Sequence, residues 1–508
     1  MLARAATTPG ALRGCPPVAA ARCRRLGGAV PAVPSAPRPF NQVPGEWRAG
    51  WLNLYRFWQE GGPSQLHLIM ARKFRQFGPI YREKLGVYES VNIISPGDAA
   101  TLFQAEGALP ERFSVPPWVA YRDFRNKPYG VLLKTGEAWR SDRLMLNKEV
   151  LAPEVVPGFV PLLSQVGEDF VRRARAQAQQ SGRDCWTADF SHELFRFALE
   201  SVCHVLYGER LGLLQDFVQP EAQRFIEAVT RMFHTTAPML YLPPALLRRL
   251  NTRTWRDHVQ AWDAIFCQAD KCIQNVYRDL RLRRKSTQEY MGILCNLILR
   301  DKLPLDDIRA SVTEMMAGGV DTTSMTLQWA MFELARSPGV QEQLRAEVLA
   351  AKREAGGDRE KMLKSTRLLK AAIKETLRLH PVAVTLQRYI THEVILQDYR
   401  IPAKTLVQVG LYAMGRDAAV FPKPEQFRPQ RWLAAGPKPF QGLSFGFGPR
   451  QCLGRRIAEL EMQLFLMHIL ENFKIETMRA VEIGTKFDLI LIPDKPIQLT
   501  LRPLECQA

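Results

Sequence analysis

The chain has 508 residues, 46% of them hydrophobic and 24% charged. This is the composition of a globular protein with one large core or two to three ordinary ones, which excludes a disordered chain. The 69 Lys and Arg residues exceed the 51 Asp and Glu residues, and the formal net charge of +18 predicts attraction to acidic partners or anionic membrane surfaces.

Two other classes of protein are disfavoured. No nucleic acid is expected as a partner, because no recognition-helix, zinc-finger or RNA-binding signature accompanies the positive charge. The nine cysteines lack the paired spacing of a zinc ribbon and the density of a secreted disulfide scaffold. A reducing compartment therefore fits the cysteine usage best.

The start of the chain has the composition of a targeting segment. Residues 1–38 are rich in arginine and alanine, contain no acidic residue and lack the apolar run of a secretory signal. We expect a mitochondrial transit peptide over about residues 1–39 and one folded domain over residues 40–508, with a disordered basic tail as the alternative for the first segment. A Pro-rich run at residues 31–44 marks the junction.

After the junction, the hydrophobic pattern predicts helices with a few short strands. Apolar and polar residues partly alternate over residues 80–94, which indicates an early β-rich patch. Apolar residues three and four positions apart indicate helices from residue 137 to about residue 352. Strand signals return at residues 384–390, 394–401 and 487–501. We therefore expect a mainly α fold with small β-sheets in a single domain, without a run of about 18 apolar residues that would span a membrane.

A helical stretch at residues 317–323 contains two glycines, Gly318 and Gly319, in its middle. Each glycine costs a helix about 1 kcal/mol relative to alanine, so the position must need the space or the loosened backbone. Asp321 and Thr322 follow, and an acid beside an alcohol can relay protons from water to a reacting group. These two residues are the catalytic candidates, and a polar kink in a buried helix is the alternative.

Residues 445–454, with the sequence FGFGPRQCLG, carry the strongest signal in the chain. Three glycines and a proline predict a tight loop, and the apolar periodicity of residues 457–470 predicts a helix after it. Cys452 then lies at the start of that helix, where partly positive backbone amides favour the thiolate over the thiol. Arg450 adds a positive charge two residues away. A buried free cysteine behind a glycine loop is the alternative.

The spacing of Phe445, Gly448, Arg450, Cys452 and Gly454 resembles the cysteine-loop signature of the cytochrome P450 family. The resemblance implies a haem-thiolate monooxygenase that contains haem b (iron-protoporphyrin IX) between a long central helix and the cysteine loop. Cys452 would be the axial ligand of the iron, and the thiolate would donate electron density that favours O–O cleavage. The family's central helix likewise implies Thr322 as the distal hydroxyl and Asp321 as the relay carboxylate.

The resemblance also covers residues that would hold the haem and brace its surroundings. Its expected propionate-binding residues are Trp139 and Arg143, which match a Trp-x-x-x-Arg pattern, with Arg388 and Arg450. Glu375 and Arg378 match the family's Glu-x-x-Arg helix, although the same spacing occurs elsewhere in the chain as ordinary helix pairs. Arg431 would join them in a salt-bridged triad with a structural role.

Features near the cysteine resemble the mitochondrial branch of this family. Arg455 and Arg456 follow Gly454 directly, and Lys370 and Lys374 lie one turn apart on the predicted helix of Glu375. These four cations would suit an acidic, adrenodoxin-type ferredoxin that receives electrons from NADPH through a ferredoxin reductase. An ordinary solvated basic face is the alternative.

Within this branch, several segments resemble enzymes that act on the side chain of cholesterol: residues 51–58, 77–86, 116–121, 318–329 and 385–389. The resemblance implies conversion of cholesterol to pregnenolone by two hydroxylations at adjacent side-chain carbons and cleavage between them. The residues expected to line the sterol pocket are Phe113, Trp118, Met232, Phe233, Thr385, Gln387, Ile490 and Leu491. Ala383 occupies a place where a serine is expected, so polar contacts in that part of the pocket stay open.

Residues 238–249 are apolar and then basic, which predicts a patch that dips into the inner mitochondrial membrane surface from the matrix side. A buried loop between two helices is the alternative for this segment. Two other functions also remain open. One is a different mitochondrial steroid or sterol hydroxylase with the same haem chemistry, and the other is a haem-binding sensor without turnover, against which Asp321 and Thr322 argue.

Overall fold

The computed structural model describes residues 36–215, 220–282, 292–300, 302–434, 440–477 and 482–504. Residues 1–35 of the expected transit peptide lie outside the described residues. From Arg38 onward the chain forms one compact unit. Within the described ranges, no helix combines the length and the hydropathy that crossing a membrane requires.

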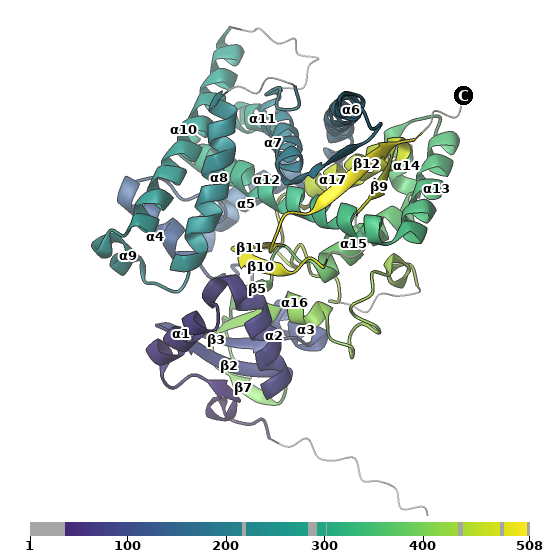
Figure 1. Cartoon of the computed structure of the whole chain (residues 1–508). Coiled ribbons are helices and arrows are strands. Elements are labelled where there is room, and N and C mark those ends of the chain that lie inside the picture. The colour runs from purple at the N-terminus through teal and green to yellow at the C-terminus, as the bar shows by residue number, and fades with distance from the viewer. Residues whose placement is uncertain are drawn as a thin grey trace, which may run out of the picture. The chain divides into compact units, whose positions relative to one another are not determined.

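Helices dominate this unit (Figure 1). Their bounds are α1 (Gly50–Gln59), α2 (Leu66–Phe77), α3 (Pro96–Gln104), α4 (Pro116–Arg125), α5 (Gly136–Val150), α6 (Val156–Gln180), α7 (Ser191–Tyr207), α8 (Pro220–Met239), α9 (Pro244–Leu250), α10 (Arg253–Arg281), α11 (Gly292–Arg300), α12 (Leu305–Arg336), α13 (Pro338–Glu354), α14 (Arg359–Ser365), α15 (Arg367–Leu379), α16 (Leu411–Gly415) and α17 (Arg455–Asn472).

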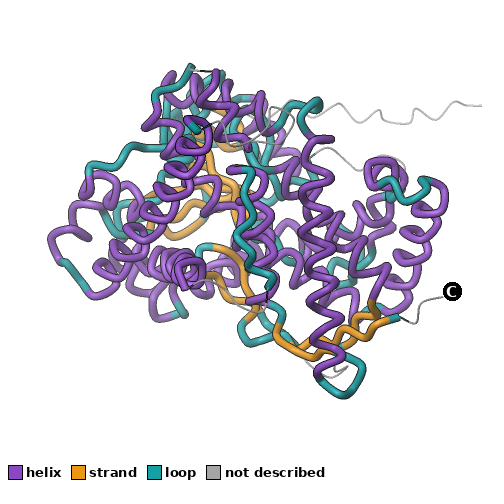
Figure 2. Tube along the Cα trace, turned by 90° about the horizontal axis from the view of Figure 1, so that it is seen from above, coloured by secondary structure: helices purple, strands orange, loops and turns teal. Residues whose placement is uncertain are grey.

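The strands form four small sheets, which Figure 2 shows as separate groups among the helices. The largest has the order β1-β2-β3-β8-β5, a second has the order β4-β12-β9, and β6–β7 and β10–β11 are hairpins. The strands are β1 (Gly45–Glu46), β2 (Ile80–Leu85), β3 (Tyr88–Ile93), β4 (Trp186–Asp189), β5 (Thr385–Tyr389), β6 (Val394–Leu396), β7 (Tyr399–Ile401), β8 (Leu406–Gly410), β9 (Phe473–Glu476), β10 (Thr485–Asp488), β11 (Ile490–Pro493) and β12 (Gln498–Pro503).

The predicted mixture of helices and short strands is confirmed. The early β-rich patch is the antiparallel pair β2 and β3, which turns at Gly86 with a φ of +59° that favours glycine. The strand signals after residue 384 correspond to β5, β6 and β7, and the last signal corresponds to β10, β11 and β12. The strand β8 was not predicted, because all five of its residues are buried and its sequence therefore does not alternate.

The helix α12 lies at the centre of the unit and contacts α7, α10, α13, α15 and α17. Its apolar residues lie on all sides, as expected for a helix that is enclosed by others. One of its glycines permits this packing: a Cβ at Gly319 would lie 3.1 Å from the Cγ2 of Val202 on α7. By contrast, a Cβ at Gly318 would have no heavy atom within 4 Å. The two glycines therefore serve different purposes, close packing at Gly319 and an open face at Gly318.

Amphipathic helices cover this centre. On α10 the buried side chains include Trp255, Val259, Trp262 and Phe266, which recur with helical spacing. The rings of this stripe pack against aromatic residues of α4, namely Trp118, Tyr121 and Phe124, and α10 also lies beside α8 (Figure 1). On the other side α17 packs against α6 and α13. The cysteine loop that precedes α17 is consequently held by a helix whose middle is embedded in the core.

Candidate active site

The Cys452 loop is closed by backbone hydrogen bonds. Gly446 and Gly448 both adopt a φ of +74°, which side chains strongly disfavour and which allows the chain to reverse direction twice. The N–H of Cys452 donates to the carbonyl oxygen of Phe445 at 2.8 Å, and Gly454 caps α17. The side chain of Cys452 is exposed, whereas Leu453 and Arg450 on either side of it are buried. The loop therefore exposes the thiol of Cys452 while neighbouring side chains of the loop are buried.

The surroundings of Cys452 act on its thiol in opposite directions. Although the sulfur faces an open space, the protein atoms packed around it exclude much of the water, and this desolvation raises the pKa of Cys452, while the N–H of Gly454 and the charge of Arg143 lower this pKa. The backbone contribution that the sequence predicted is present, but burial exceeds it. Coordination to a metal ion removes the proton of a thiol outright, so a thiolate here fits metal ligation better than it fits an unligated cysteine.

Four arginines gather near the loop and repel one another. Burial and the charges of Arg112, Arg388 and Arg143 lower the pKa of Arg450 to about 9. Burial and the charge of Arg388 lower the pKa of Arg112 to about 10, and burial lowers the pKa of Arg143 to about 10. Positive charge is therefore in excess here, and a group with more than one negative charge would stabilise the cluster.

The free N–H groups of these arginines define what the cluster could bind. The Nε atoms of Arg143 and Arg450 are buried and have no hydrogen-bond partner, although the other end of each guanidinium donates to the carbonyl oxygens of Gln451 and Lys134, at 2.7 Å and 2.6 Å. Arg388 is already paired with Glu106. The guanidinium carbon of Arg450 lies 4.3 Å from the ring centre of Trp139. The donor set fits the two carboxylates of a haem.

Arg112 was missed by the sequence reasoning. The residue before it, Glu111, forms a β-bridge with Tyr389 and accepts the backbone N–H of Tyr389 at 3.0 Å. This contact brings Arg112 beside Arg388, although the two residues are far apart in the sequence and Arg112 belongs to no recognisable motif. Only the tertiary pairing of these segments could have identified it.

Asp321 and Thr322 lie on α12, next to its open face. The hydroxyl of Thr322 donates to the carbonyl oxygen of Gly318 at 2.8 Å, so its oxygen keeps a lone pair for a further donor. Asp321 is buried, and its Oδ2 has no hydrogen-bond partner. Burial, and after it the charge of Asp488, raises the pKa of Asp321 to about 8. A carboxyl with this pKa can both accept and release a proton near neutral pH.

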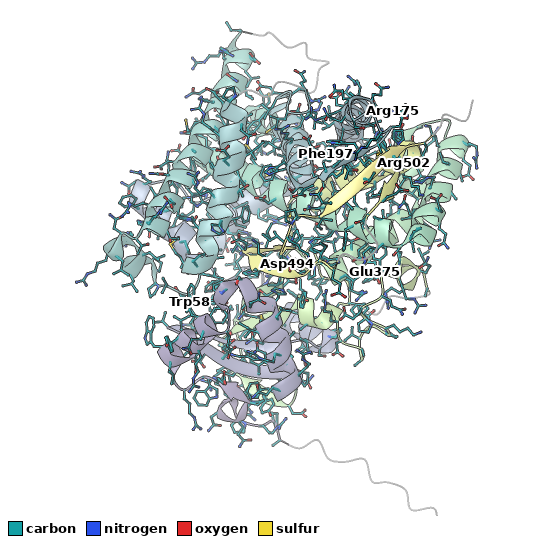
Figure 3. All side chains as sticks on the ribbon, in the orientation of Figure 1. Trp58, Arg175, Phe197, Glu375, Asp494 and Arg502 are labelled. Atoms are coloured by element: carbon teal, nitrogen blue, oxygen red, sulfur yellow. The ribbon has the colours of Figure 1, made fainter. Side chains whose placement is uncertain are left out.

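Glu375 on α15 lies at the centre of a buried cluster (Figure 3). Both of its carboxylate oxygens accept hydrogen bonds from Arg378, at 2.9 Å and 2.8 Å, and Oε1 also accepts one from Arg431 at 2.9 Å. The structure thus brings the three expected triad residues together. It adds two donors that the sequence did not suggest, the backbone N–H of Arg428 at 2.9 Å and the indole N–H of Trp432 at 2.8 Å.

The residues expected to line a sterol pocket come from four elements and the segment before α4. Trp118 and Met232 lie on adjacent helices, and the indole N–H of Trp118 donates to Thr236 at 2.9 Å. Met232 and Leu491 are wholly enclosed by protein atoms, Phe113, Phe233 and Ile490 are buried, and Thr385 and Gln387 are partly buried on β5. The side-chain amide of Gln387 donates one hydrogen bond to Gln408 at 2.8 Å, which leaves its oxygen and its second N–H for a ligand. Ala383 is exposed in the turn before β5.

The four cations expected to meet a ferredoxin, Lys370, Lys374, Arg455 and Arg456, line one groove of about 760 Å³. Arg455 is paired with Glu459 at 3.1 Å. Within the described part of the chain, Lys374 and Arg456 are exposed and have no acidic partner within salt-bridge distance. The groove also contains Phe445 and Gly446 of the cysteine loop, so its positive charge lies directly behind Cys452.

The expectation that residues 238–249 contact a membrane surface stays a prediction, since the structure buries some of these residues and leaves others at least partly exposed. Met239, Leu240 and Leu247 are buried, because the chain turns inward between α8 and α9. Tyr241 packs edge-on against Phe57 of α1, with ring centres 5.6 Å apart. Leu250, which follows this segment, is exposed, and α1 carries further exposed apolar residues: Trp51, Leu52, Tyr55 and Trp58.

Comparisons with known proteins agree with this geometry. Three relatives described as "Cholesterol side-chain cleavage enzyme, mitochondrial" align over most of both chains. The Oncorhynchus mykiss protein is 59% identical over 92% of this chain and 91% of its own length, and the Sus scrofa protein is 57% identical over 92% and 90%. The Homo sapiens protein is 54% identical over 93% of this chain and 91% of its own length.

The fold is also found among solved structures. A crystal structure of a cytochrome P450 (CYP102L1) superposes with a TM-score of 0.73 and covers 92% of this chain and all of that chain, at 22% identity. The expected architecture, mainly α with small sheets, is thus confirmed. The sequence profile of the cytochrome P450 family matches residues 44–501, and the chain therefore belongs to the cytochrome P450 family.

Proposed function

We propose that this chain is a haem-thiolate monooxygenase that converts cholesterol to pregnenolone by two successive side-chain hydroxylations and cleavage of the carbon–carbon bond between them. The observation that carries the proposal is the 54–59% identity, over more than nine-tenths of both chains, to enzymes named for this reaction. The reaction is chemically consistent with an outward-facing thiol at Cys452 and an acid–alcohol pair on α12.

In this proposal the cysteine loop and the arginine cluster hold the cofactor. Haem b, when bound, supplies the iron at which molecular oxygen is activated for insertion into a C–H bond. Cys452 would provide the sulfur that binds the iron, and Arg112, Arg143 and Arg450 would neutralise the propionates, with the ring of Trp139 against the guanidinium of Arg450. Arg388 would contribute less, because Glu106 already compensates its charge.

Asp321 and Thr322 would move protons during the reaction. The hydroxyl of Thr322 is held in place by its hydrogen bond to the carbonyl oxygen of Gly318. The free lone pair of this hydroxyl can accept a hydrogen bond from another proton donor. Asp321 exchanges protons near neutral pH, as its raised pKa requires, and returns to its starting state after each transfer. Glu375, Arg378 and Arg431 would act at a distance, since their cluster fixes the position of α15 beside the cysteine loop.

The substrate would lie among apolar side chains with few polar partners, an arrangement that suits a sterol. The eight expected pocket residues supply this surface, and the oxygen and second N–H of Gln387 are polar groups available to a sterol hydroxyl. Electrons would enter through the groove with Lys374 and Arg456, whose uncompensated charges attract an acidic, adrenodoxin-type ferredoxin. Lys370 and Arg455 line the same groove.

The relatives carry the word mitochondrial in their names, and we propose that this chain is a peripheral protein on the matrix side of the inner mitochondrial membrane. The arginine-rich residues 1–39 would act as the transit peptide. The exposed Trp51, Tyr55 and Trp58, one or two helical turns apart on α1, would contact the membrane surface.

A reconstitution experiment tests the substrate. The purified haem-loaded protein is incubated with NADPH, ferredoxin reductase, adrenodoxin and a panel of sterols and steroids, and the products are identified by mass spectrometry. We expect pregnenolone from cholesterol as the main product. Hydroxylation of another steroid without side-chain cleavage would favour the alternative hydroxylase, and a Thr322→Ala variant with unchanged coupling of oxygen use to product would favour a protein without this turnover.

A further inference from the structure

The buried carboxyl of Asp321 has no visible source of protons on its own helix. Its Oδ2 is enclosed and without a partner. Three polar side chains of α12 near it donate elsewhere: the hydroxyl of Thr322 to the backbone oxygen of Gly318, the hydroxyl of Ser324 to the backbone oxygen of Asp321, and the amide of Gln328 to Asp189. A relay that returns to its starting state after each turnover needs a connection to solvent, which must therefore come from another element.

The β10–β11 hairpin supplies a second carboxylate near this position. Asp488 is the last residue of β10 and pairs with Ile490, so that Leu489 alone forms the tip, with a φ of +64°. The strand β11 contacts α12, and the N–H of Leu491 anchors the hairpin by donating to the carbonyl oxygen of Val382 at 2.9 Å. The hairpin thus holds the carboxylate of Asp488 close enough to α12 for its charge to raise the pKa of Asp321, after burial.

A histidine on α8 connects this carboxylate to solvent. The Nδ1 of His234 lies 3.0 Å from Oδ2 of Asp488, and α8 packs against β10. The side chain of His234 is 73% exposed and that of Asp488 is 20% exposed, while Asp321 is buried. Exposure therefore decreases stepwise from the histidine to the catalytic candidate, as a path that carries protons inward requires.

We propose that His234 and Asp488 form the proton inlet of Asp321. The imidazole of His234 takes a proton from bulk water and passes its Nδ1 proton to the carboxylate of Asp488. Asp488 then passes the proton, through water, to the Asp321 carboxylate. Each donor returns to its starting charge as it gives up its proton, and the exposed imidazole, left protonated at Nε2, resets by turning its ring or by exchanging protons with water. The inference deepens the proposed function, because it rests on the relay role proposed for Asp321.

Other ionisable groups around the hairpin do not offer the same route. His67 on α2 contacts the hydroxyl of Thr485 at 2.8 Å, but it is 1% exposed and burial lowers its pKa to about 4, so it stays neutral and cut off from solvent. Lys486 shares the face of Asp488 on β10, because side chains two residues apart in a strand point the same way. Arg231 lies one turn before His234 on α8. Both side chains are cations that donate hydrogen bonds and have no lone pair free to take up a proton, so they cannot replace the imidazole in this path.

The test uses two variants of the haem-loaded enzyme, His234→Gln and Asp488→Asn. The matched control is His392→Gln, since His392 is also an exposed histidine but contacts only its neighbour Thr391. Infrared difference spectroscopy follows the carboxylic C=O stretch of Asp321 during a pH titration of the substrate-free ferric protein, and Asp321→Asn identifies the band. The titration midpoint of the Asp321 carboxyl should be lower in Asp488→Asn than in the wild type, because a neighbouring negative charge is removed. This midpoint should not change in His392→Gln.

The second measurement is the amount of product formed per NADPH. It tests proton delivery, whereas the infrared titration tests only the pKa of Asp321. Both variants should lower the product formed per NADPH by about tenfold and release the difference as reduced oxygen species, with a larger solvent isotope effect than in the control. Two results would refute the proposed proton inlet. One is an unchanged titration midpoint of the Asp321 carboxyl in Asp488→Asn, and the other is a yield of product per NADPH in both variants that equals the yield of the control. Failure of the wild type to cleave cholesterol would instead refute the proposed substrate, and the infrared titration would still test the inlet.

Discussion

Replacement of Glu375 by glutamine is expected to destabilise the protein severely. The carboxylate is fully enclosed and accepts five hydrogen bonds from Arg378, Arg431, Arg428 and Trp432. In Glu375→Gln one carboxylate oxygen becomes an amide nitrogen. If Oε2 is replaced, the N–H groups of Arg378 and Trp432 that donate to it lose their acceptor and face another N–H donor, and the guanidinium groups of Arg378 and Arg431 lose their counter-charge. Removing one member of a buried ion pair costs about 3–5 kcal/mol, and each buried donor left without an acceptor costs about 1–3 kcal/mol. We therefore expect a loss of at least about 4 kcal/mol.

The chain provides a matched control with the same sequence spacing. Glu342 and Arg345 also form a Glu-x-x-Arg pair, but their charged atoms are 3.6 Å apart and the side chain of Glu342 is 59% exposed. An exposed pair contributes about 0–1 kcal/mol, so Glu342→Gln should change little. The entropy of unfolding of a unit of this length is ~1 kcal/mol per degree, which converts the loss in Glu375→Gln to a fall of about 4 °C in the unfolding temperature.

The assay heats each haem-loaded variant under identical conditions and records the temperature at which half of the helical circular dichroism signal is lost. Comparing variants at a fixed heating rate is necessary because a protein with a bound cofactor need not unfold in a two-state transition. Equal unfolding temperatures for Glu375→Gln and Glu342→Gln would refute the reasoning, since the two substitutions differ only in burial and in the number of hydrogen bonds lost.

Three further predictions concern the site. Since the pKa of Asp321 is about 8 in the folded protein and 3.8 in the unfolded chain, the stability that this group contributes is fully present below pH 3.8 and is lost as the pH rises from 3.8 to 8; Asp321→Asn should therefore raise the unfolding temperature much more at pH 9 than at pH 5, and an equal effect at both values would contradict the raised pKa. Arg112→Ala should weaken haem retention about tenfold or more, as measured by transfer of haem to apomyoglobin. The control Arg125→Ala, at an exposed arginine paired with Asp263, should retain haem as the wild type does, and equal retention in both variants would show that Arg112 is not part of the site. Lys374→Glu should raise the KM for ferredoxin several-fold at low salt and leave kcat with saturating ferredoxin nearly unchanged, whereas Lys361→Glu, at an exposed lysine beside Asp358, should have little effect; a KM unchanged by Lys374→Glu would argue against docking in the groove.

The sequence predicted those features whose signal is local. The glycines of the Cys452 loop, the helix after it and the glycine pair on α12 have short-range causes, and the structure shows each of them. The β8 strand could not be predicted from alternation, because both of its faces are buried. Pro238 and the apolar residues after it have the pattern of a surface patch, which does not reveal that Met239, Leu240 and Leu247 are buried or that Tyr241 packs against Phe57 of α1.

The site residues divide in the same way. The cysteine, the acid–alcohol pair and the Glu-x-x-Arg spacing are visible as motifs, whereas Arg112 is found only through the β-bridge that places it beside Arg388. The Asp488–His234 contact joins residues 254 positions apart. Its two members lie on a hairpin and a helix that meet only in the folded chain, so no local pattern could reveal them.

The most direct test of the account is the difference spectrum of the reduced protein with and without carbon monoxide. The wild type should bind haem and show the red-shifted band of thiolate ligation, and Cys267→Ser, at an exposed cysteine outside the loop, should keep this band. Cys452→His should lose it while it still binds haem. A wild type that remains colourless after haem supplementation, or a Cys452→His variant with an unchanged band, would contradict the assignment of Cys452 as the iron ligand.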